Sequence, residues 1–258
     1  MTPTTRDATN LLLHGALALT RASRAGISVD EEYLDQAIAN TDQKIAACEK
    51  SLHDSEEWGK WKWRFKEKAN LTSSKQLAVT LYDLMGFECL KKTDRGGRST
   101  DAEALEHIST PFVRSYIEMQ SLKKLNSTFL RGLQKEVVDG LFHPMFNLHS
   151  TTTYRSSSGR DTTQGGSDHD LNFHNLPIRN EIQGPVIRPC FRAREGRVIA
   201  EADFGAHEFK CAAAVWGDPG MMEYASDDKK CVHYDWTAKC YRCTVPQVSK
   251  AMRAVGKN

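Results

Sequence analysis

The sequence predicts an α+β protein whose first half is almost wholly helical. Apolar residues recur at helical spacing in several segments before Gly140, whereas "LFHPMFNLHSTTTYR" after it brings β-branched and aromatic residues at strand-like spacing. A second apolar run, "RVIAEADF", is typical of a buried strand and leads into the helical pattern "AHEFKCAAAVWG". With 258 residues, 40% of them hydrophobic, the chain is long enough for two or more lobes.

The helices of the first half follow from periodicity and end signals. Residues 7–25 form a first helix that ends at Gly26, and a second helix opens near "SVDEE" and continues to about Lys68 as one long arm. "NLTSSKQLAVTLYDLMG" is a short helix, and Thr100 stands three residues before Glu103, which is the spacing of a capping box. The segment "TPFVRSYIEMQSLKKLNSTFLRGL" then continues as another long amphipathic helix.

Beyond the first strands, glycine and serine in "SSSGRDTTQGGSDHD" predict a long loop. The helix that follows "RVIAEADF" ends at Gly217. Two further helices are predicted in "CVHYDWTAKCYRC" and "VPQVSKAMRAVGKN", the second with Pro246 in its first turn.

Composition excludes some classes of protein. No apolar run approaches the roughly 20 residues of a membrane helix, and the N-terminus lacks the basic start of a secretory signal, so we expect a cytoplasmic protein with no membrane partner. The seven cysteines are expected to be free thiols. The net charge is only +2, and basic stretches such as "GKWKWRFKEK" are explained most simply as solvated helix faces, although they could contact polyanions.

The segment "EADFGAHEFKCAAAVWGDPGMM" resembles the first catalytic motif of family A DNA polymerases, the bacterial DNA polymerase I type. The shared pattern is an acid (Asp203), an aromatic, a small residue, and then Glu208, an apolar residue and the basic Lys210. Other segments resemble the same family in the same order. They are "SLKKLNSTFLRGL" in its thumb, "SSGRD" and "LNFHNLPIR" in its template–primer contact region, and "CVHYDWTA" and "MRAVGKN" at the start of its fingers.

This resemblance implies a mostly helical thumb followed by part of an antiparallel palm sheet and the first fingers helices. The implied divisions are a connecting helix at 1–30, the thumb at 31–134, a partial palm with the first catalytic motif at 135–217, and the start of the fingers at 218–258. The implied activity is that of a DNA-directed DNA polymerase, which adds deoxynucleotides to a primer 3′ end in replication or repair.

The chemistry of such a polymerase explains the acid at position 203. Phosphoryl transfer uses two Mg²⁺ ions, and hard cations prefer carboxylate and carbonyl oxygens. The resemblance makes Asp203 the catalytic metal ligand, joined by the backbone carbonyl of Phe204. A simple alternative is that Asp203 caps the helix that follows it.

The resemblance also assigns residues to the incoming nucleotide and to DNA. Glu208 would exclude a ribose 2′-hydroxyl, and the predicted nucleotide-binding residues are Gly205, Glu208, His233, Arg253 and Lys257. The predicted primer–template contacts are Asn126, Ser127, Thr128, Arg160, Asn172, His174, Asn175 and Arg179.

The sequence departs from the family pattern at several of these positions. Arg155 competes with Arg160 for one contact, because the loop after it is longer than usual. His174 stands where Gln is commoner, and Cys231 stands where Asp is usual.

The His-Asp-Glu motif that carries the second metal-binding Asp in this family is not found in the sequence. We therefore expect a fragment, truncated within the fingers, that binds primer–template DNA and deoxynucleoside triphosphates as a monomer but extends a primer poorly or not at all.

Three alternatives remain open. One is a non-catalytic DNA-binding remnant of a polymerase. Another is a relative of RNA-templated or single-subunit RNA polymerases, against which Glu208 argues. The third is a zinc site at Cys231, His233, Cys240 and Cys243, whose donor types suit zinc although their spacing is short.

Overall fold

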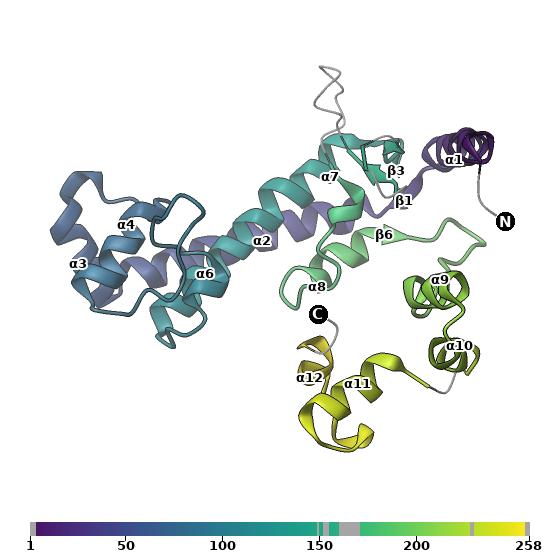
Figure 1. Cartoon of the computed structure of the whole chain (residues 1–258). Coiled ribbons are helices and arrows are strands. Elements are labelled where there is room, and N and C mark those ends of the chain that lie inside the picture. Colours follow the sequence, from purple (N-terminus) through teal and green to yellow (C-terminus); the bar gives the residue numbers. More distant parts are fainter. Residues whose placement is uncertain (1–3, 149, 152–154, 160–170, 228–229, 256–258) are drawn as a thin grey trace. The chain divides into compact units, whose positions relative to one another are not determined.

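The computed structural model describes residues 4–148, 150–151, 155–159, 171–227 and 230–255 (Figure 1). The chain divides into two compact units, Met1–Ile199 and Ala200–Asn258. The boundary falls inside the segment that the sequence assigns to the partial palm, and the four-part division stays a prediction. None of the helices in the described ranges is long and apolar enough to cross a membrane.

The first unit begins with α1 (Thr5–Ala25), which starts at a capping box between Thr4 and Asp7. The helix ends at Gly26, whose φ of 65° favours glycine. A Cβ at Gly26 would also lie 2.8 Å from the His143 ring. The strand β1 (Ile27–Val29) therefore begins directly after the turn at Gly26.

The long arm predicted to reach Lys68 is two helices, α2 (Glu31–His53) and α3 (Glu56–Phe65), so that prediction is wrong. Ser55 has an extended backbone, with φ −82° and ψ 155°, and its hydroxyl accepts a hydrogen bond from the Trp58 N–H. A serine that caps a new helix in this way also ends the preceding one.

A small helical subdomain follows α3. It contains η1 (Lys66–Lys68), α4 (Ser74–Ala78), the π-helical turn η2 (Val79–Leu84) and α5 (Ala102–Leu105). Its core includes Trp61, Leu77, Leu81 and Met119, all fully buried, and the Trp61 indole N–H donates to Gln76 Oε1 at 2.9 Å. Asp101, not Thr100, caps α5, because its carboxylate accepts from the Ala104 N–H at 2.8 Å.

The chain then returns along α2 as one continuous helical segment (Figure 1). It consists of α6 (Pro111–Lys124), the π-helical turn η3 (Leu125–Leu130) and α7 (Arg131–Glu136). Leu34 and Ile38 of α2 belong to one buried cluster with Leu125, Leu130 and Leu133 of this segment.

A four-stranded antiparallel sheet closes that cluster. Its order is β2 (Val137–Val138), β3 (Leu141–Phe142), β1 and β6 (Phe191–Arg192). Ile27 pairs with Phe142, and Ser28 pairs with Arg192. A separate pair joins β4 (Phe146–Asn147) to β5 (Ser157–Ser158), and η4 (Phe173–Asn175), α8 (Gly184–Ile187) and η5 (Arg188–Cys190) complete the unit. The predicted α+β class is confirmed.

The second unit is helical in its described part. Its elements are α9 (His207–Trp216), α10 (Pro219–Ser226), α11 (Val232–Tyr241), η6 (Val245–Gln247) and α12 (Lys250–Val255). Among its described residues only Ala213, Thr237, Ala238 and Val248 are buried, so this unit has a small core.

The strand predicted in "RVIAEADF" is not formed, so that prediction is wrong. Residues 197–204 have no strand assignment, and Val198 is 87% exposed. A strand needs a partner for its N–H and C=O groups, and no strand in the described ranges pairs with this segment.

Candidate nucleotide and DNA sites

Asp203 lies in the exposed segment just before α9 and does not cap that helix. The helix begins at His207 after Ala206, which has left-handed backbone angles of φ 51° and ψ 39° and makes no side-chain cap hydrogen bond. The alternative interpretation of Asp203 as an N-cap is therefore wrong. Within the described residues the Asp203 carboxylate makes no hydrogen bond or ion pair, and it is exposed.

A pocket of about 260 Å³ brings several of the predicted nucleotide-binding residues together in the second unit. Gly205, His233 and Arg253 line it, although they lie on the approach to α9, on α11 and on α12. Glu208 does not line the pocket, although it lies on α9 and is exposed. Lys257 lies outside the described residues.

Two lysines that were not assigned to the site from the sequence also line this pocket, Lys210 and Lys230. Lys210 occupies the basic position of the motif that begins at Asp203, and this position could have indicated from the sequence that Lys210 belongs to the site. Lys230 carries no motif signal. Among the described lining residues, the cations Lys210, Lys230 and Arg253 outnumber the one carboxylate, Asp227, so the pocket suits a polyanion such as a polyphosphate.

Neighbouring aromatic and acidic groups hold two of these cations in place. The Lys230 ammonium pairs with Glu223 and lies 5.5 Å from the centre of the Tyr224 ring. The hydrogen bond that the Lys230 ammonium donates to the Glu223 carboxylate raises the pKa of Lys230. The Arg253 guanidinium lies 4.9 Å from the centre of the Tyr234 ring, and its Nε is buried with no hydrogen-bond partner in the described part of the chain.

An unpaired buried donor is costly, about 1–3 kcal/mol, so its presence in a cationic pocket calls for an acceptor. The oxygens of a phosphate supply such acceptors.

The first unit has a separate hollow of about 440 Å³ that is lined by Thr128, Asn172 and Asn175, three of the predicted DNA contacts. The Asn172 side chain is held by the Ser158 hydroxyl, which donates to its Oδ1 at 3.0 Å. Lys124 lines the same hollow, and the sequence did not single it out. Amide, hydroxyl and ammonium groups on one surface can contact phosphates and minor-groove acceptors without reading sequence.

Asn126 differs from its neighbours because it is buried, with 4% of its surface exposed. Its amide donates to Asp42 Oδ1 at 2.6 Å, and its carbonyl accepts from Arg131 Nε at 2.9 Å. Arg131 also pairs with Asp42 at 2.7 Å. This side chain therefore joins η3 to α2, while Ser127 and Thr128 beside it are exposed.

The other predicted DNA contacts lie outside this hollow. His174 and Arg179 are exposed, and the His174 ring lies 5.5 Å from Phe146 in an edge-on arrangement. Arg160 lies outside the described residues, and its competitor Arg155 is exposed. These contacts stay predictions.

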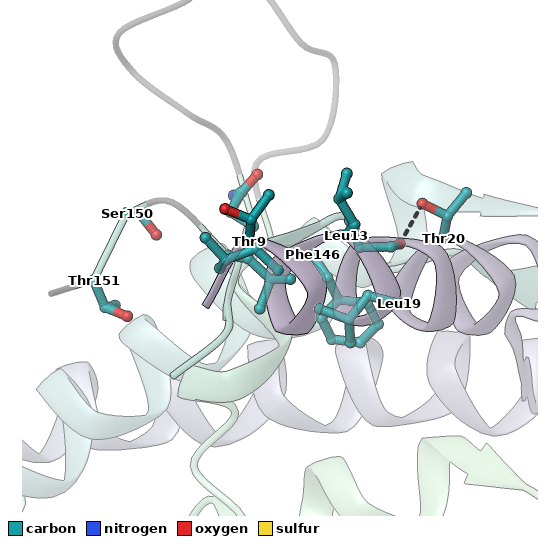
Figure 2. Close-up of a pocket in the computed structure, with 11 residues that line it drawn as sticks. Thr9, Leu13, Leu19, Thr20, Phe146, Ser150 and Thr151 are labelled. Carbon is teal, nitrogen blue, oxygen red and sulfur yellow. Dashed lines mark hydrogen bonds between the residues drawn. The ribbon is translucent and has the colours of Figure 1, made fainter. Parts of the chain in front are cut away.

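A larger pocket, of about 880 Å³, lies between α1 and residues 146–148, 150 and 151 (Figure 2). Its lining is largely apolar and includes Leu13, Leu19 and Phe146, which Figure 2 shows together with Thr9 and Thr20. None of the predicted catalytic, nucleotide or DNA residues lines it.

No group of three or more His, Cys, Asp or Glu side chains in the described residues could hold a metal ion. The zinc alternative at Cys231, His233, Cys240 and Cys243 therefore has no support, and all seven cysteines are free, as predicted. For Mg²⁺ the available donor is the Asp203 carboxylate, with the Phe204 carbonyl beside it. Those two oxygens suit Mg²⁺ in kind but are too few to complete its octahedral shell.

A cationic pocket next to the segment that carries Asp203, together with a hollow that presents amide, hydroxyl and ammonium groups, fits a protein that handles nucleotides and nucleic acid. A family model for DNA polymerase family A matches residues 31–258. The chain belongs to this family.

The curated relatives are DNA polymerases several times longer than this chain. The chain is 32% identical to DNA polymerase I of Geobacillus stearothermophilus over 203 residues, which are 77% of this chain and 21% of that protein. It is 30% identical to the DNA polymerase of Escherichia phage T5 over 83% of this chain and 24% of that protein. It is 28% identical to DNA polymerase I of Bacillus subtilis (strain 168) over 94% of this chain and 26% of that protein. The chain thus spans about a quarter of these relatives or less.

A solved structure agrees with these relatives. The POL domain of Pol1 from M. smegmatis, in complex with DNA primer–template and dNTP, is 28% identical to the chain and superimposes with a TM-score of 0.71. The match covers 93% of this chain and 39% of that one.

Proposed function

We propose that the chain is the thumb, the first catalytic motif and the first fingers helices of a DNA-directed DNA polymerase. In this proposal the first unit binds primer–template DNA, and the pocket of the second unit binds the triphosphate of an incoming deoxynucleotide. The observation that supports it most is the convergence of Gly205, His233 and Arg253 on one cationic pocket, because the family resemblance had assigned these three to the nucleotide.

Each side chain has a defined task in this proposal. Arg253, Lys210 and Lys230 neutralise the phosphates, and Gly205, which has no side chain, lets them approach the backbone closely. Asp203 would hold Mg²⁺, which supplies neutralisation of the charge that develops on the phosphates. Glu208 would lie against the sugar and exclude a 2′-hydroxyl.

We further propose that the chain as it stands binds substrates but extends a primer poorly or not at all. One carboxylate, Asp203, leaves the Mg²⁺ shell incomplete, and metal clamping is most of the catalysis in phosphoryl transfer. The non-catalytic alternative shares this expectation for the isolated chain. We also propose that the chain acts as a monomer.

The first test is calorimetric titration of the chain with dATP and with ATP, both in the presence of Mg²⁺. We expect dATP to bind more tightly than ATP, and Arg253→Ala to weaken dATP binding by about 10-fold or more, because a charge-assisted hydrogen bond is lost. Lys250→Ala is the matched control, since Lys250 is an exposed cation on the same helix that does not line the pocket. Equal dATP affinity in Arg253→Ala and the unaltered chain would overturn the assignment.

A primer-extension assay with Mg²⁺ tests the second part. We expect DNA binding with little or no extension. Robust extension that Asp203→Ala abolishes would contradict the proposal that this chain only binds, and incorporation of ribonucleotides in preference would favour the RNA polymerase alternative.

A further inference from the structure

The helix α3 buries two of its three tryptophans and exposes the third. Trp58 and Trp61 are 9% and 0% exposed, whereas Trp63 is 74% exposed. No aromatic ring or cation in the described chain stacks on the Trp63 indole. The other two tryptophans of this helix belong to the core. The exposure of the large apolar Trp63 ring to water therefore indicates that this ring binds a partner.

The neighbour one turn before Trp63 leaves that ring accessible. Side chains on a helix lean toward its N-terminus, so Trp63 lies over the turn that contains Gly59 and Lys60. A Cβ at Gly59 would meet nothing within 4 Å, so packing does not require a glycine there. The absence of a side chain at Gly59 leaves an indole face uncovered.

Basic residues lie on both sides of Trp63 in the sequence. Five exposed cations lie within the same short segment, and with Trp63 they define the α3 surface: Lys60, Lys62, Arg64, Lys66 and Lys68. Lys60 pairs with Glu56 at 3.3 Å, and the Arg64 guanidinium lies 5.7 Å from the centre of the Phe65 ring.

The other three cations, Lys62, Lys66 and Lys68, make no ion pair with any described residue. The helix dipole accounts for basic residues in the last turn of α3, but not for Lys66 and Lys68 beyond it, and not for Trp63.

We propose that the α3 surface binds single-stranded DNA, with the Trp63 indole stacked on an unpaired base and the lysines on the flanking phosphates. An accessible aromatic ring among cations is the combination that single strands require, because every unpaired base offers a π face and the backbone offers negative charge. Duplex DNA fits less well, since its bases are already stacked on one another.

This surface is separate from the hollow at Thr128 and Asn172. Figure 1 shows α3 at one end of the paired α2 and α6, with β1 and β3 at the other end of the same unit. The proposal therefore does not depend on the nucleotide pocket or on the primer–template contacts.

The test is fluorescence anisotropy of a labelled oligothymidylate of about 15 nucleotides, a length that suits single-strand sites, with the whole chain. It is run alone and again with saturating unlabelled blunt-ended duplex DNA, which has no unpaired bases, so that binding at the duplex site is subtracted. We expect Trp63→Ala to weaken binding about 10-fold, and Trp63→Phe, which keeps a stacking ring, to retain most of it. Replacing Lys62 and Lys66 by alanine should lower the slope of log affinity against log salt by about 1.4.

Two control variants separate this effect from general ones. Trp216 is 73% exposed on α9 and is not part of the α3 surface, so Trp216→Ala should leave oligothymidylate affinity unchanged. Lys44→Ala removes an exposed lysine of α2, outside the α3 surface, and should likewise leave oligothymidylate affinity unchanged.

Unchanged affinity in Trp63→Ala, with its thermal unfolding also unchanged, would overturn the proposal. So would equal competition by duplex DNA of the same length, or Trp63-dependent binding to phosphatidylglycerol vesicles without Trp63-dependent binding to the oligothymidylate.

Discussion

The Arg253 guanidinium lies 4.9 Å from the centre of the Tyr234 ring, so a residue of α12 is held by a residue of α11. This contact orients the guanidinium without using its donors, because the ring interacts with the face of the cation. The buried Nε is therefore still available to a phosphate oxygen.

The first prediction concerns this ring. Tyr234→Leu should weaken dATP binding by about 2- to 5-fold, since a partly exposed cation–π contact is worth about 0.5–1 kcal/mol. The loss should be smaller than that in Arg253→Ala, and the double variant should be no worse than Arg253→Ala alone, as calorimetric titration can determine. Fully additive losses would mean that Tyr234 does not act through Arg253.

A second prediction separates two polar residues that are close in sequence. Asn126→Ala should lower the free energy of unfolding by about 1–3 kcal/mol, because it leaves Asp42 and Arg131 without a shared partner. Lys124→Ala should leave stability unchanged but weaken primer–template binding and lower its salt dependence, because Lys124 lines the hollow that we propose contacts DNA. Urea unfolding and anisotropy with labelled primer–template measure the two effects. Loss of DNA affinity in Asn126→Ala without loss of stability would favour a direct DNA contact.

Replacing glycine by alanine should have opposite effects on the free energy of unfolding at two positions, Gly59 and Gly184. Gly59→Ala should raise the free energy of unfolding by about 1 kcal/mol, because glycine is a poor helix former and a Cβ there meets nothing within 4 Å. Gly184→Ala should lower it by about 1–3 kcal/mol, because its Cβ would lie 2.6 Å from the backbone oxygen of Ile178. Urea unfolding of both variants tests the pair, and a stabilised Gly184→Ala would show that this close approach is relieved by a small backbone shift.

The cysteines should differ in their reactivity. Burial raises the pKa of the Cys190 thiol to about 12, so at about pH 8 it has almost no thiolate. Cys211 and Cys240 are exposed and should react first with a disulfide reagent, while Cys190 should react only after unfolding in urea. Mass spectrometry of the labelled peptides measures this order, and rapid labelling of Cys190 in the folded chain would contradict its burial.

The raised pKa of the Cys190 thiol also sets the direction in which the stability of the fold changes with pH. A raised pKa means that the fold favours the neutral thiol, so the associated stability is complete below the ordinary thiol pKa of 9.0 and is lost as the pH rises toward about 12.

Local signals predicted much of this structure. The helix that ends at Gly217 was predictable because a glycine follows an apolar helical pattern, and its φ of 65° explains the choice of residue. The break between α2 and α3 was missed because the apolar period continues across Ser55, whose capping role depends on a hydrogen bond that periodicity does not contain. The absent strand at 197–204 was missed for a different reason, since strand formation depends on a partner elsewhere in the chain.

The lining of the two candidate pockets was predictable where a motif carried it and not elsewhere. Gly205, His233 and Arg253 came from family-like segments, whereas Lys230 and Lys124 reach their pockets only through the packing of helices that no single segment encodes. Asn126 has the residue type of a DNA contact, but Asp42, far from it in sequence, engages its amide.

The small core of the second unit has a consequence for the thermodynamics of its pocket. With Ala213, Thr237, Ala238 and Val248 as its buried described residues, that unit gains little free energy from apolar burial. A nucleotide whose phosphates contact α9, α11 and α12 would therefore contribute part of the free energy that holds these three helices together. Nucleotide binding is accordingly expected to carry a large favourable enthalpy offset by unfavourable entropy, so that its affinity falls steeply on warming.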